Sequence, residues 1–459
     1  MYSILVQRIR QAQRDSGLYF AALLSEQTIT DSFAEASRTE RASTVYRMPV
    51  VLWMFLSQIL SSDHSCRETV ARLNAWRVRR GKSPCSAATG RYCIARDQLN
   101  EAGCQRLVKN SARQIEDLAP EEWKWEGHRV RTVDGTTVTM PDTPANQKEY
   151  PQQAEQKPGC GQPIMRLVVL FSLATGVAVR VAMGPYQGKR TGENSLFRQH
   201  LSEELCPGDV LLADRCFSGW FDIVLLAQRG VEVVLRKHQF RPTDFRSGTR
   251  IGPDDHRITW PKPCRPAWMS WEQYETLPDQ LELREIRIRV HKRGFRSKQI
   301  LVVTTLLNPH QYAARSIAAL YRRRWDAEIN LRSLKTHLQM EHLRCKKPHR
   351  VRNEVRMHLL AYNLIRGTMA TSAIEAGLTP WTISFKGTVQ TLNQFLPTCF
   401  PDQRLETWVR QMLSAIATHI VGHRPDRVEP RVVKRRPKPY KLMMQPRWLL
   451  RKGLPTKGI

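Results

Sequence analysis

Three acidic residues of this chain stand where their carboxylates could converge at one edge of a sheet: Asp134, Asp214 and Glu328. Asp134 lies in the apolar and β-branched run Val133–Thr136, where a charge is costly unless a partner compensates it. Asp214 follows the apolar run Val210–Ala213, and open α/β sheets bind ligands at such strand ends. Three carboxylates together suit hard divalent cations, which clamp the attacking and leaving oxygens in phosphodiester chemistry.

Each acid also has a simpler interpretation. Asp134 and Gly135 could form a hairpin turn, and Asp214 could cap the helix that follows it. Glu328 could belong to a solvated salt-bridge face with Arg324, four residues earlier. The local sequence alone leaves these alternatives open.

The segment around Glu328 is expected to be a single helix. Residues 321–335 contain neither Gly nor Pro, which favours continuous helix. On a helical wheel, Tyr321, Arg324 and Lys335 fall within roughly 40° of Glu328. One face of this helix would therefore present a carboxylate, two cations and a phenol together.

The periodicity of the chain predicts the elements that must position these acids. Strands are expected at 129–139, 164–173, 177–183, 209–213 and 231–236. One helix should begin at Thr191 as N-cap, and another should span 217–229. The order β-β-β-α-β-α-β with right-handed crossovers is that of an RNase H-like fold, so we expect an α/β catalytic core of this kind.

The remaining regions are assigned from their composition and periodicity. Helical spacing at 4–24, 49–60, 65–79 and 87–107 predicts a helical N-terminal region, and residues 83–96 resemble a turn leading into a basic helix. The expected organisation is a helical DNA-binding region (1–125), the first part of the core (126–237), a β-rich insertion (238–305), the core segment with the Glu328 helix (306–375), a helical region (376–424) and a basic extended tail (425–459).

The charge balance points to a polyanionic partner. The chain has 459 residues with 72 Lys and Arg against 42 Asp and Glu, a formal net charge of +30. Charge alone would also suit a ribosomal, chromatin or membrane-surface protein. The ten cysteines form no C-x-x-C pair and are expected to be buried reduced thiols, and no secretory signal opens the chain, so a cytoplasmic protein without a membrane partner is expected.

A resemblance to a known family strengthens these interpretations. Tyr-x2-Arg-x3-Glu-x6-Lys, present at Tyr321, Arg324, Glu328 and Lys335, is the YREK signature of the insertion-sequence transposases of the IS-four family. Residues 133–136 and 208–217 resemble the first and second catalytic strands of that family, and residues 150–176 resemble the stretch between them. The resemblance covers most of residues 40–450.

The resemblance implies a DDE transposase that cleaves DNA at insertion-sequence ends and joins them to a target. Asp134, Asp214 and Glu328 would hold two Mg²⁺ ions, for which Mn²⁺ can substitute. The partners would be double-stranded DNA, as terminal inverted repeats and target, and further copies of the chain in a dimer or larger synaptic complex at the bacterial nucleoid. Tyr321, Arg324 and Lys335 would hold end phosphates, with Arg215 beside them.

Other features refine this hypothesis. Lys189 and Arg190 are expected in a basic, DNA-contacting turn, and His342, His349 and His358 are better explained by DNA contact than by zinc. Relatives place a base-stacking Trp where this chain has Ile300, which leaves the hairpin route open. The candidate aromatic residues for base stacking are Trp268, Trp271 and Phe295. The alternatives are an RNase H-like nuclease or resolvase without strand transfer, and a domesticated descendant that only binds DNA.

Overall fold

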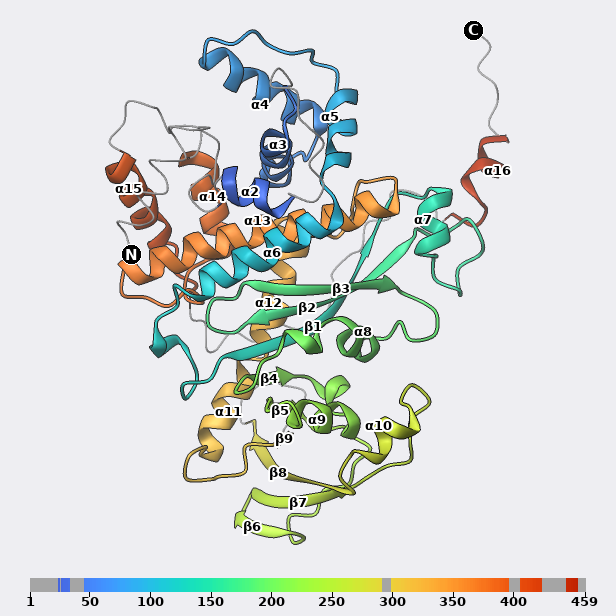
Figure 1. Ribbon diagram of the computed structural model, residues 1–459, viewed down its shortest axis with the longest axis vertical. Coiled ribbons are helices and arrows are strands. Elements are labelled where there is room, and N and C mark those ends of the chain that lie inside the picture. The colour runs from blue at the N-terminus through green and yellow to red at the C-terminus, as the bar shows by residue number, and fades with distance from the viewer. Residues whose placement is uncertain are drawn as a thin grey trace, which may run out of the picture. The chain divides into compact units, whose positions relative to one another are not determined.

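The computed structural model describes residues 24, 26–33, 45–290, 299–395, 405–422 and 443–452. The chain forms two compact units, each assembled from separate segments. Unit 1 comprises residues 1–123, 174–180 and 329–421, and unit 2 comprises residues 124–173, 181–328 and 422–459. Figure 1 labels the elements of both units. Most of the basic tail and the helix expected at 4–24 lie outside the described residues.

Unit 2 is built on a sheet of nine strands in the order β3-β2-β1-β4-β5-β9-β8-β7-β6. The first residues of β3 belong to unit 1. The strands are β1 (Val130–Thr139), β2 (Ile164–Ser172), β3 (Ala178–Pro185), β4 (Val210–Ala213), β5 (Glu232–Arg236), β6 (Thr249–Gly252), β7 (Asp255–Pro261), β8 (Gln280–Arg289) and β9 (Gln299–Thr304).

The first five strands have the winding expected from the sequence. β1 pairs antiparallel with β2 and parallel with β4, and β4 pairs parallel with β5. The parallel pairs are connected through α8 (Glu193–His200) and α9 (Trp220–Ala227), as crossover units require. The strand order and these pairings confirm the RNase H-like α/β core. A short helix not expected from the sequence, α7 (Pro144–Glu149), lies between β1 and β2 in the chain.

The insertion extends the core sheet with further strands. β9 pairs antiparallel with β5, and β8, β7 and β6 follow in antiparallel pairs. A buried ion pair joins β7 and β8, because the Arg284 guanidinium donates to both carboxylate oxygens of Asp255 at 2.8 and 2.6 Å. Arg284 also donates to the carbonyl oxygen of Tyr312 at 2.6 Å. The short α10 (Trp271–Glu275) lies between β7 and β8 in the chain.

A hydrophobic cluster fixes α11 (Ala314–Arg322) against this sheet. The α11 side chains of Ile317, Leu320 and Tyr321 are almost completely buried in it. The strand residues of the cluster are Val130, Val210, Leu212, Val234, Ile286, Ile288 and Val302. The helix that leads to Glu328 is thereby packed against the strands that carry the two aspartates.

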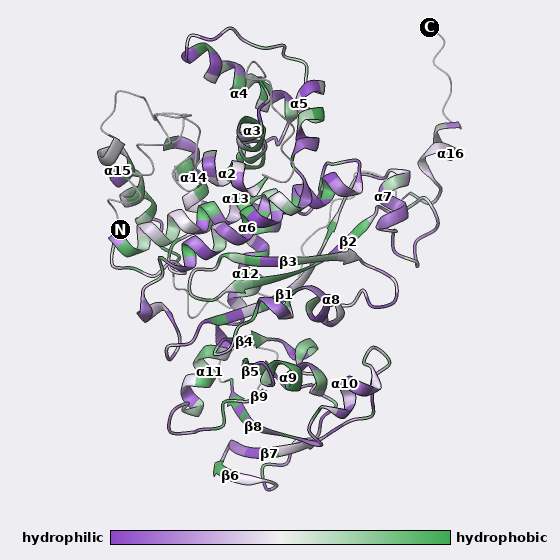
Figure 2. Cartoon of the chain, viewed as in Figure 1, coloured by the Kyte–Doolittle hydropathy of each residue, from purple (hydrophilic) through white to green (hydrophobic). Residues whose placement is uncertain are grey.

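Unit 1 is a helical assembly around one long helix. The 28-residue α13 (Pro348–Glu375) packs against α6, α15 and α3, and most of its side chains are buried. Figure 2 shows α3 mostly in the colour of hydrophobic residues, in agreement with its nine buried residues. The other helices are α2 (Glu26–Ser32), α3 (Met48–Leu60), α4 (Cys66–Arg79), α5 (Gly90–Ala95), α6 (Glu101–Glu116), α14 (Phe385–Phe395) and α15 (Leu405–Ala417).

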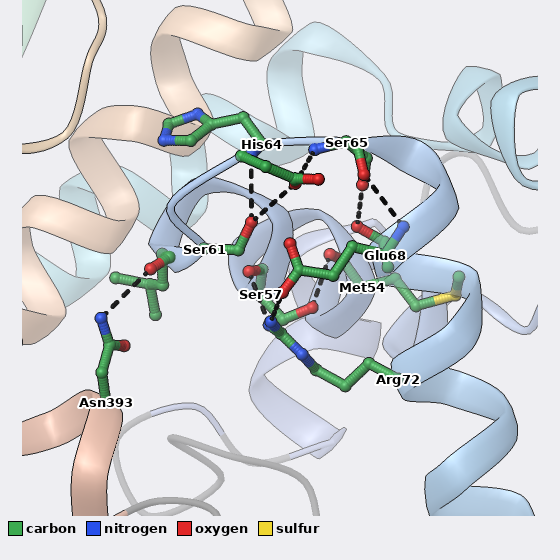
Figure 3. Close-up of polar contacts among 11 residues, drawn as sticks. Met54, Ser57, Ser61, His64, Ser65, Glu68, Arg72 and Asn393 are labelled. Atoms are coloured by element: carbon green, nitrogen blue, oxygen red, sulfur yellow. Dashed lines mark hydrogen bonds and ion pairs between the residues drawn. The ribbon is translucent and has the colours of Figure 1, made fainter.

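Polar side chains fix the turn between α3 and α4, as Figure 3 shows. Ser65 caps α4 by accepting a hydrogen bond from the backbone N–H of Glu68 at 3.0 Å. Ser61 Oγ accepts from the backbone N–H of His64, whose φ of 54° is left-handed. The His64 ring is stacked on that of His358 in α13, with centroids 6.1 Å apart. This turn is therefore held at both its backbone and its side chains.

Several expectations for the N-terminal helices need correction. The helix expected at 87–107 is divided into α5 and α6, because Asn100 adopts an extended conformation and caps α6 by accepting from Gly103 N–H.

Other expectations from the sequence are corrected as well. His358 is only 2% exposed, so the expectation that it contacts DNA is wrong. No described cysteine forms a disulfide bond, and Cys206, Cys216 and Cys264 are exposed rather than buried. In the part of the chain that the structure describes, no helix is both long and apolar enough to span a bilayer.

Candidate active site

Asp134 lies in the middle of β1, which excludes the hairpin-turn alternative. It faces Val169 of β2 in the antiparallel ladder, and its Oδ1 accepts a hydrogen bond from the N–H of Gly135 at 2.8 Å. Burial raises the pKa of the Asp134 carboxyl to about 6, although the Gly135 bond and the charge of Arg324 lower this pKa. The charges of Glu328 and Glu193 raise the same pKa. Asp134 is therefore a half-buried acid among other carboxylates.

Asp214 follows the neighbouring strand at the same level as Asp134. The parallel register pairs Val130 with Val210 and Thr132 with Leu212. Continuing this register by two residues places Asp134, in the middle of β1, level with Asp214, which follows the carboxyl end of β4. Asp214 Oδ1 also accepts from the N–H of Cys216 at 2.7 Å, capping the 3₁₀ turn Arg215–Phe217. Asp214 therefore caps this short turn and not the helix α9, whose N-cap is Gly219, and the bond also orients the carboxylate.

The helix expected across residues 321–335 is interrupted twice. α11 ends at Arg322 and α12 (Trp325–Arg332) begins three residues later, followed by the π-helical turn Ser333–His337. At the junction the N–H groups of Arg323 and Arg324 bond to carbonyl oxygens three residues earlier, as in a 3₁₀ helix. The expected wheel angles between Tyr321, Arg324, Lys335 and Glu328 therefore do not apply.

Arg324 nevertheless meets Glu328 directly. Its Nη2 donates to Glu328 Oε1 at 2.6 Å, and the two side chains are 16% and 36% exposed. The charges of both residues act on the pKa of Asp134. Glu328 and Arg324 therefore lie close enough to Asp134 for their charges to act on its pKa, although the connecting backbone differs from a simple helix.

Tyr321 lies deeper than a surface phosphate contact would require. Its side chain belongs to the hydrophobic cluster and is 5% exposed. Burial raises the pKa of its phenol to about 12, against the lowering effect of Arg324, Arg236 and Arg215, while the charge of Asp214 raises it. At neutral pH the phenol keeps its proton and can donate a hydrogen bond toward this group of charges.

Other cationic residues expected at the site have varied surroundings. Arg215 donates to the side-chain oxygen of Gln239. Lys189 and Arg190 are exposed, and Arg190 has a φ of 62°. Lys335 lies in the π-helical turn in unit 1, where its ammonium is 3.6 Å from a carboxylate oxygen of Glu341.

The helix after the basic turn begins one residue later than expected. Gly192 occupies the N-cap position of α8, and the Thr191 hydroxyl instead donates to the carbonyl oxygen of Gly188 at 2.9 Å. Glu193 is consequently the first residue of α8. The correction matters because it places an acidic side chain at the helix start.

Three residues near these acids were missed from the sequence: Glu193, Arg166 and Arg236. Burial raises the pKa of Glu193, the charge of Arg166 lowers it, and the charge of Asp214 raises it. Arg236 ends β5, and continuing the β4–β5 register from Ala213 and Leu235 places it beside Asp214. The available signal was topological, because helices and strands that precede or follow a parallel strand reach the same sheet edge.

The aromatic candidates for base stacking differ in their accessibility. Ile300 is packed against the hydrophobic cluster of the sheet. The guanidinium of Arg198 lies 4.1 Å from the ring centroid of Trp268, whereas Trp271 is 62% exposed with Arg265 over its ring. Phe295 lies outside the described residues.

The oxygen donors of the site are of the kind that hard cations prefer, but the carboxylates are not arranged as a set of metal ligands. Within the described ranges, no group of three or more His, Cys, Asp or Glu side chains is arranged to hold a metal ion. The three acids nonetheless offer only oxygen donors, the kind that Mg²⁺ prefers. Burial and neighbouring acids raise the pKa values of Asp134 and Glu193, and a bound cation would favour the ionised form of both carboxyls.

Comparisons with known proteins identify the family. The family model described as "Transposase DDE domain" matches residues 125–364. The transposase InsG for insertion sequence element IS4 of Escherichia coli (strain K12) is 24% identical over 429 residues, which cover 91% of this chain and 92% of the relative. A cryo-EM structure of the piggyBac transposase synaptic complex with hairpin DNA matches with a TM-score of 0.40 and 10% identity, covering 90% of this chain and 85% of that chain. With its RNase H-like core and a family match over more than half its length, this chain belongs to the DDE transposases, the enzymes of DNA transposition.

Proposed function

We propose that the chain cleaves DNA at the ends of an insertion sequence and joins the freed ends to target DNA, using Asp134, Asp214 and Glu328. The observation that supports this most directly is the parallel register of β1 and β4, which places Asp134 level with Asp214 when it is continued two residues past Thr132 and Leu212. Glu328 is the third acid because its charge, and that of its partner Arg324, act on Asp134.

The three carboxylates would hold Mg²⁺, with Mn²⁺ as a substitute. When bound, such a cation neutralises the phosphate and supports an in-line displacement at phosphorus. The N–H of Gly135 and the N–H of Cys216 orient the two aspartates by holding one oxygen of each. Arg324 holds Glu328 in the same way at 2.6 Å.

Cationic residues of the chain would bind DNA phosphates. Arg324, Arg215 and Lys335 supply charge, and the protonated phenol of Tyr321 supplies a hydrogen-bond donor. Lys189 and Arg190 are exposed and would contact the backbone farther along the DNA. The formal net charge of +30 supports a large phosphate footprint.

Two phosphoryl transfers complete the proposed reaction. Water attacks a phosphodiester at the element end and the 3′ oxygen leaves as a hydroxyl. That hydroxyl then attacks a target phosphodiester, so one P–O bond forms as another breaks. No covalent protein–DNA bond is needed. The partners are double-stranded DNA ends and target, with a second copy of the chain in a synaptic complex at the bacterial nucleoid.

The test is cleavage and joining of a short DNA bearing the element's own ends, with a supercoiled plasmid as target and Mg²⁺ or chelator. Asp134→Asn, Asp214→Asn and Glu328→Gln should each abolish cleavage while retaining DNA binding in chelator. Asp279→Asn is the matched control, since the Asp279 side chain is 97% exposed. Native cleavage by any of the three variants would contradict the assignment of that acid.

The products distinguish the alternatives. Cut ends without plasmid joining would indicate a nuclease or resolvase. Binding of end DNA without cleavage in Mg²⁺ or Mn²⁺ would indicate a descendant that only binds DNA.

A further inference from the structure

Glu193 lies against the strand that carries Asp134. It is the first residue of α8, and its carboxyl group covers Gly135. A Cβ atom at position 135 would lie 2.2 Å from Glu193 Cδ and 2.3 Å from Oε1. The absence of a side chain at Gly135 therefore provides the space in which this carboxylate packs against β1, at the residue next to Asp134.

Two side-chain hydrogen bonds hold the start of α8 in place. Arg166 of β2 donates from Nη1 to the carbonyl oxygen of Thr191 at 3.0 Å, two residues before Glu193. Asn194 donates from its side-chain amide to the carbonyl oxygen of Cys216, two residues after Asp214. Glu193 thus stands between two hydrogen bonds that tie its backbone to β2 and to the turn that carries the second aspartate.

The acidic residues near Glu193 make the ionised form of its carboxyl group unfavourable. The charge of Glu193 acts on Asp134, and the charge of Asp214 acts on Glu193. Arg166 is the cation that opposes this repulsion at Glu193. Neighbouring like charges destabilise the ionised forms unless cations neutralise them. Arg166 is one such cation, and a divalent cation held by Asp134 and Asp214 would be a second.

We propose that Glu193 is a positioning residue of the reaction centre, whose carboxylate strengthens divalent-cation binding by Asp134 and Asp214. This inference rests on the proposed function, because it assumes that the two aspartates hold the cation. Glu193 acts beside them by adding negative charge and by fixing the surroundings of the bound ion. The competing explanation is structural, since an acid in the first turn also stabilises a helix through the helix dipole.

The test compares Glu193→Gln and Glu193→Asp with the native chain, using Mn²⁺ alone as the probe and calorimetry as the readout. Glu193→Gln should weaken Mn²⁺ binding about 10-fold, a typical effect of losing a supporting side chain beside metal ligands. The Mg²⁺ concentration for half-maximal cleavage should rise by the same factor, with the native rate recovered at saturating Mg²⁺. Binding of end DNA in chelator should stay native. Glu203→Gln is the matched control, an exposed glutamate in the same unit.

Glu193→Asp separates the two explanations. It keeps the charge at the start of α8 but shortens the reach, so a purely structural role predicts native Mn²⁺ affinity, whereas our proposal predicts weaker binding. Native Mn²⁺ affinity in both variants would overturn the inference. If Asp134→Asn also bound Mn²⁺ like the native chain, the proposed function would fail instead, so the two failures are distinguishable.

Discussion

Replacing Gly135 by alanine tests the contact between β1 and Glu193 from the other side. The new Cβ would lie 2.2 Å from Glu193 Cδ, whereas ordinary contacts of this kind begin at 3.4 Å. The carboxyl group must therefore move by about 1 Å or more, a displacement that matters where reacting groups are aligned. The atoms in the way end a flexible side chain, so the strand itself can remain in place.

The expected effect is on cation affinity rather than on stability. Displacing the Glu193 carboxylate should cost about as much as losing it, about 10-fold in Mg²⁺ affinity. Gly135→Ala should therefore raise the Mg²⁺ concentration for half-maximal single-turnover cleavage of end DNA by about this factor, while the free energy of unfolding changes by less than about 1 kcal/mol. Gly252→Ala in β6 is the matched control, because its Cβ would meet only the Asp255 Cβ at 3.7 Å.

A double-mutant cycle tests whether Gly135→Ala acts through Glu193. If Gly135→Ala acts by displacing Glu193, it should add little once Glu193 is already replaced by alanine. Equal losses in the native and Glu193→Ala backgrounds would show that Gly135 acts independently of Glu193, and the steric reasoning would be wrong.

Two further predictions concern stability. Burial lowers the pKa of His358 to about 3, against about 6.5 in the unfolded chain. The stability that comes from keeping His358 neutral is therefore complete above pH 6.5 and is lost as the pH falls toward 3. In urea unfolding between pH 7 and pH 4, the free energy of unfolding should fall by up to about 1.4 kcal/mol per pH unit. His358→Leu should flatten this dependence, and an unchanged slope would exclude His358 as the source. Asp255→Ala should destabilise unit 2 by about 3–5 kcal/mol by leaving the buried Arg284 charge unpaired, measured by denaturant unfolding. Replacing Arg284 by methionine in the same variant should recover much of that loss, and no recovery would argue against the unpaired charge as the cause.

The strands and the catalytic order were predictable because apolar runs determine them. The expected strand at 231–236, for example, differs from β5 by one residue, since Val233, Val234 and Leu235 are fully buried. The parallel order of β1, β4 and β5 followed from the alternation of strands and helices. Two of the three acids could therefore be placed by position in strands alone.

The interrupted helix before Glu328 could not be predicted from composition. Neither Gly nor Pro marks the junction, and the buried packing of Leu320 and Tyr321 fixes α11 independently of α12. Glu193 was missed for a related reason: its significance depends on Gly135, 58 residues away in sequence and in contact only after folding. The two units were also invisible to a linear reading, because each combines distant segments.

Because β9 pairs with β5, the length of the insertion does not determine where Glu328 lies. The pairing of Leu235 with Val303 returns the chain to the core sheet whatever lies beyond it, and α11 begins at Ala314, ten residues after β9 ends. Changes at the outer β6–β7 turn therefore need not shift the third acid. That turn is a natural attachment point for a fluorescent label or a fused domain, and lineages of this enzyme could vary there without losing their chemistry.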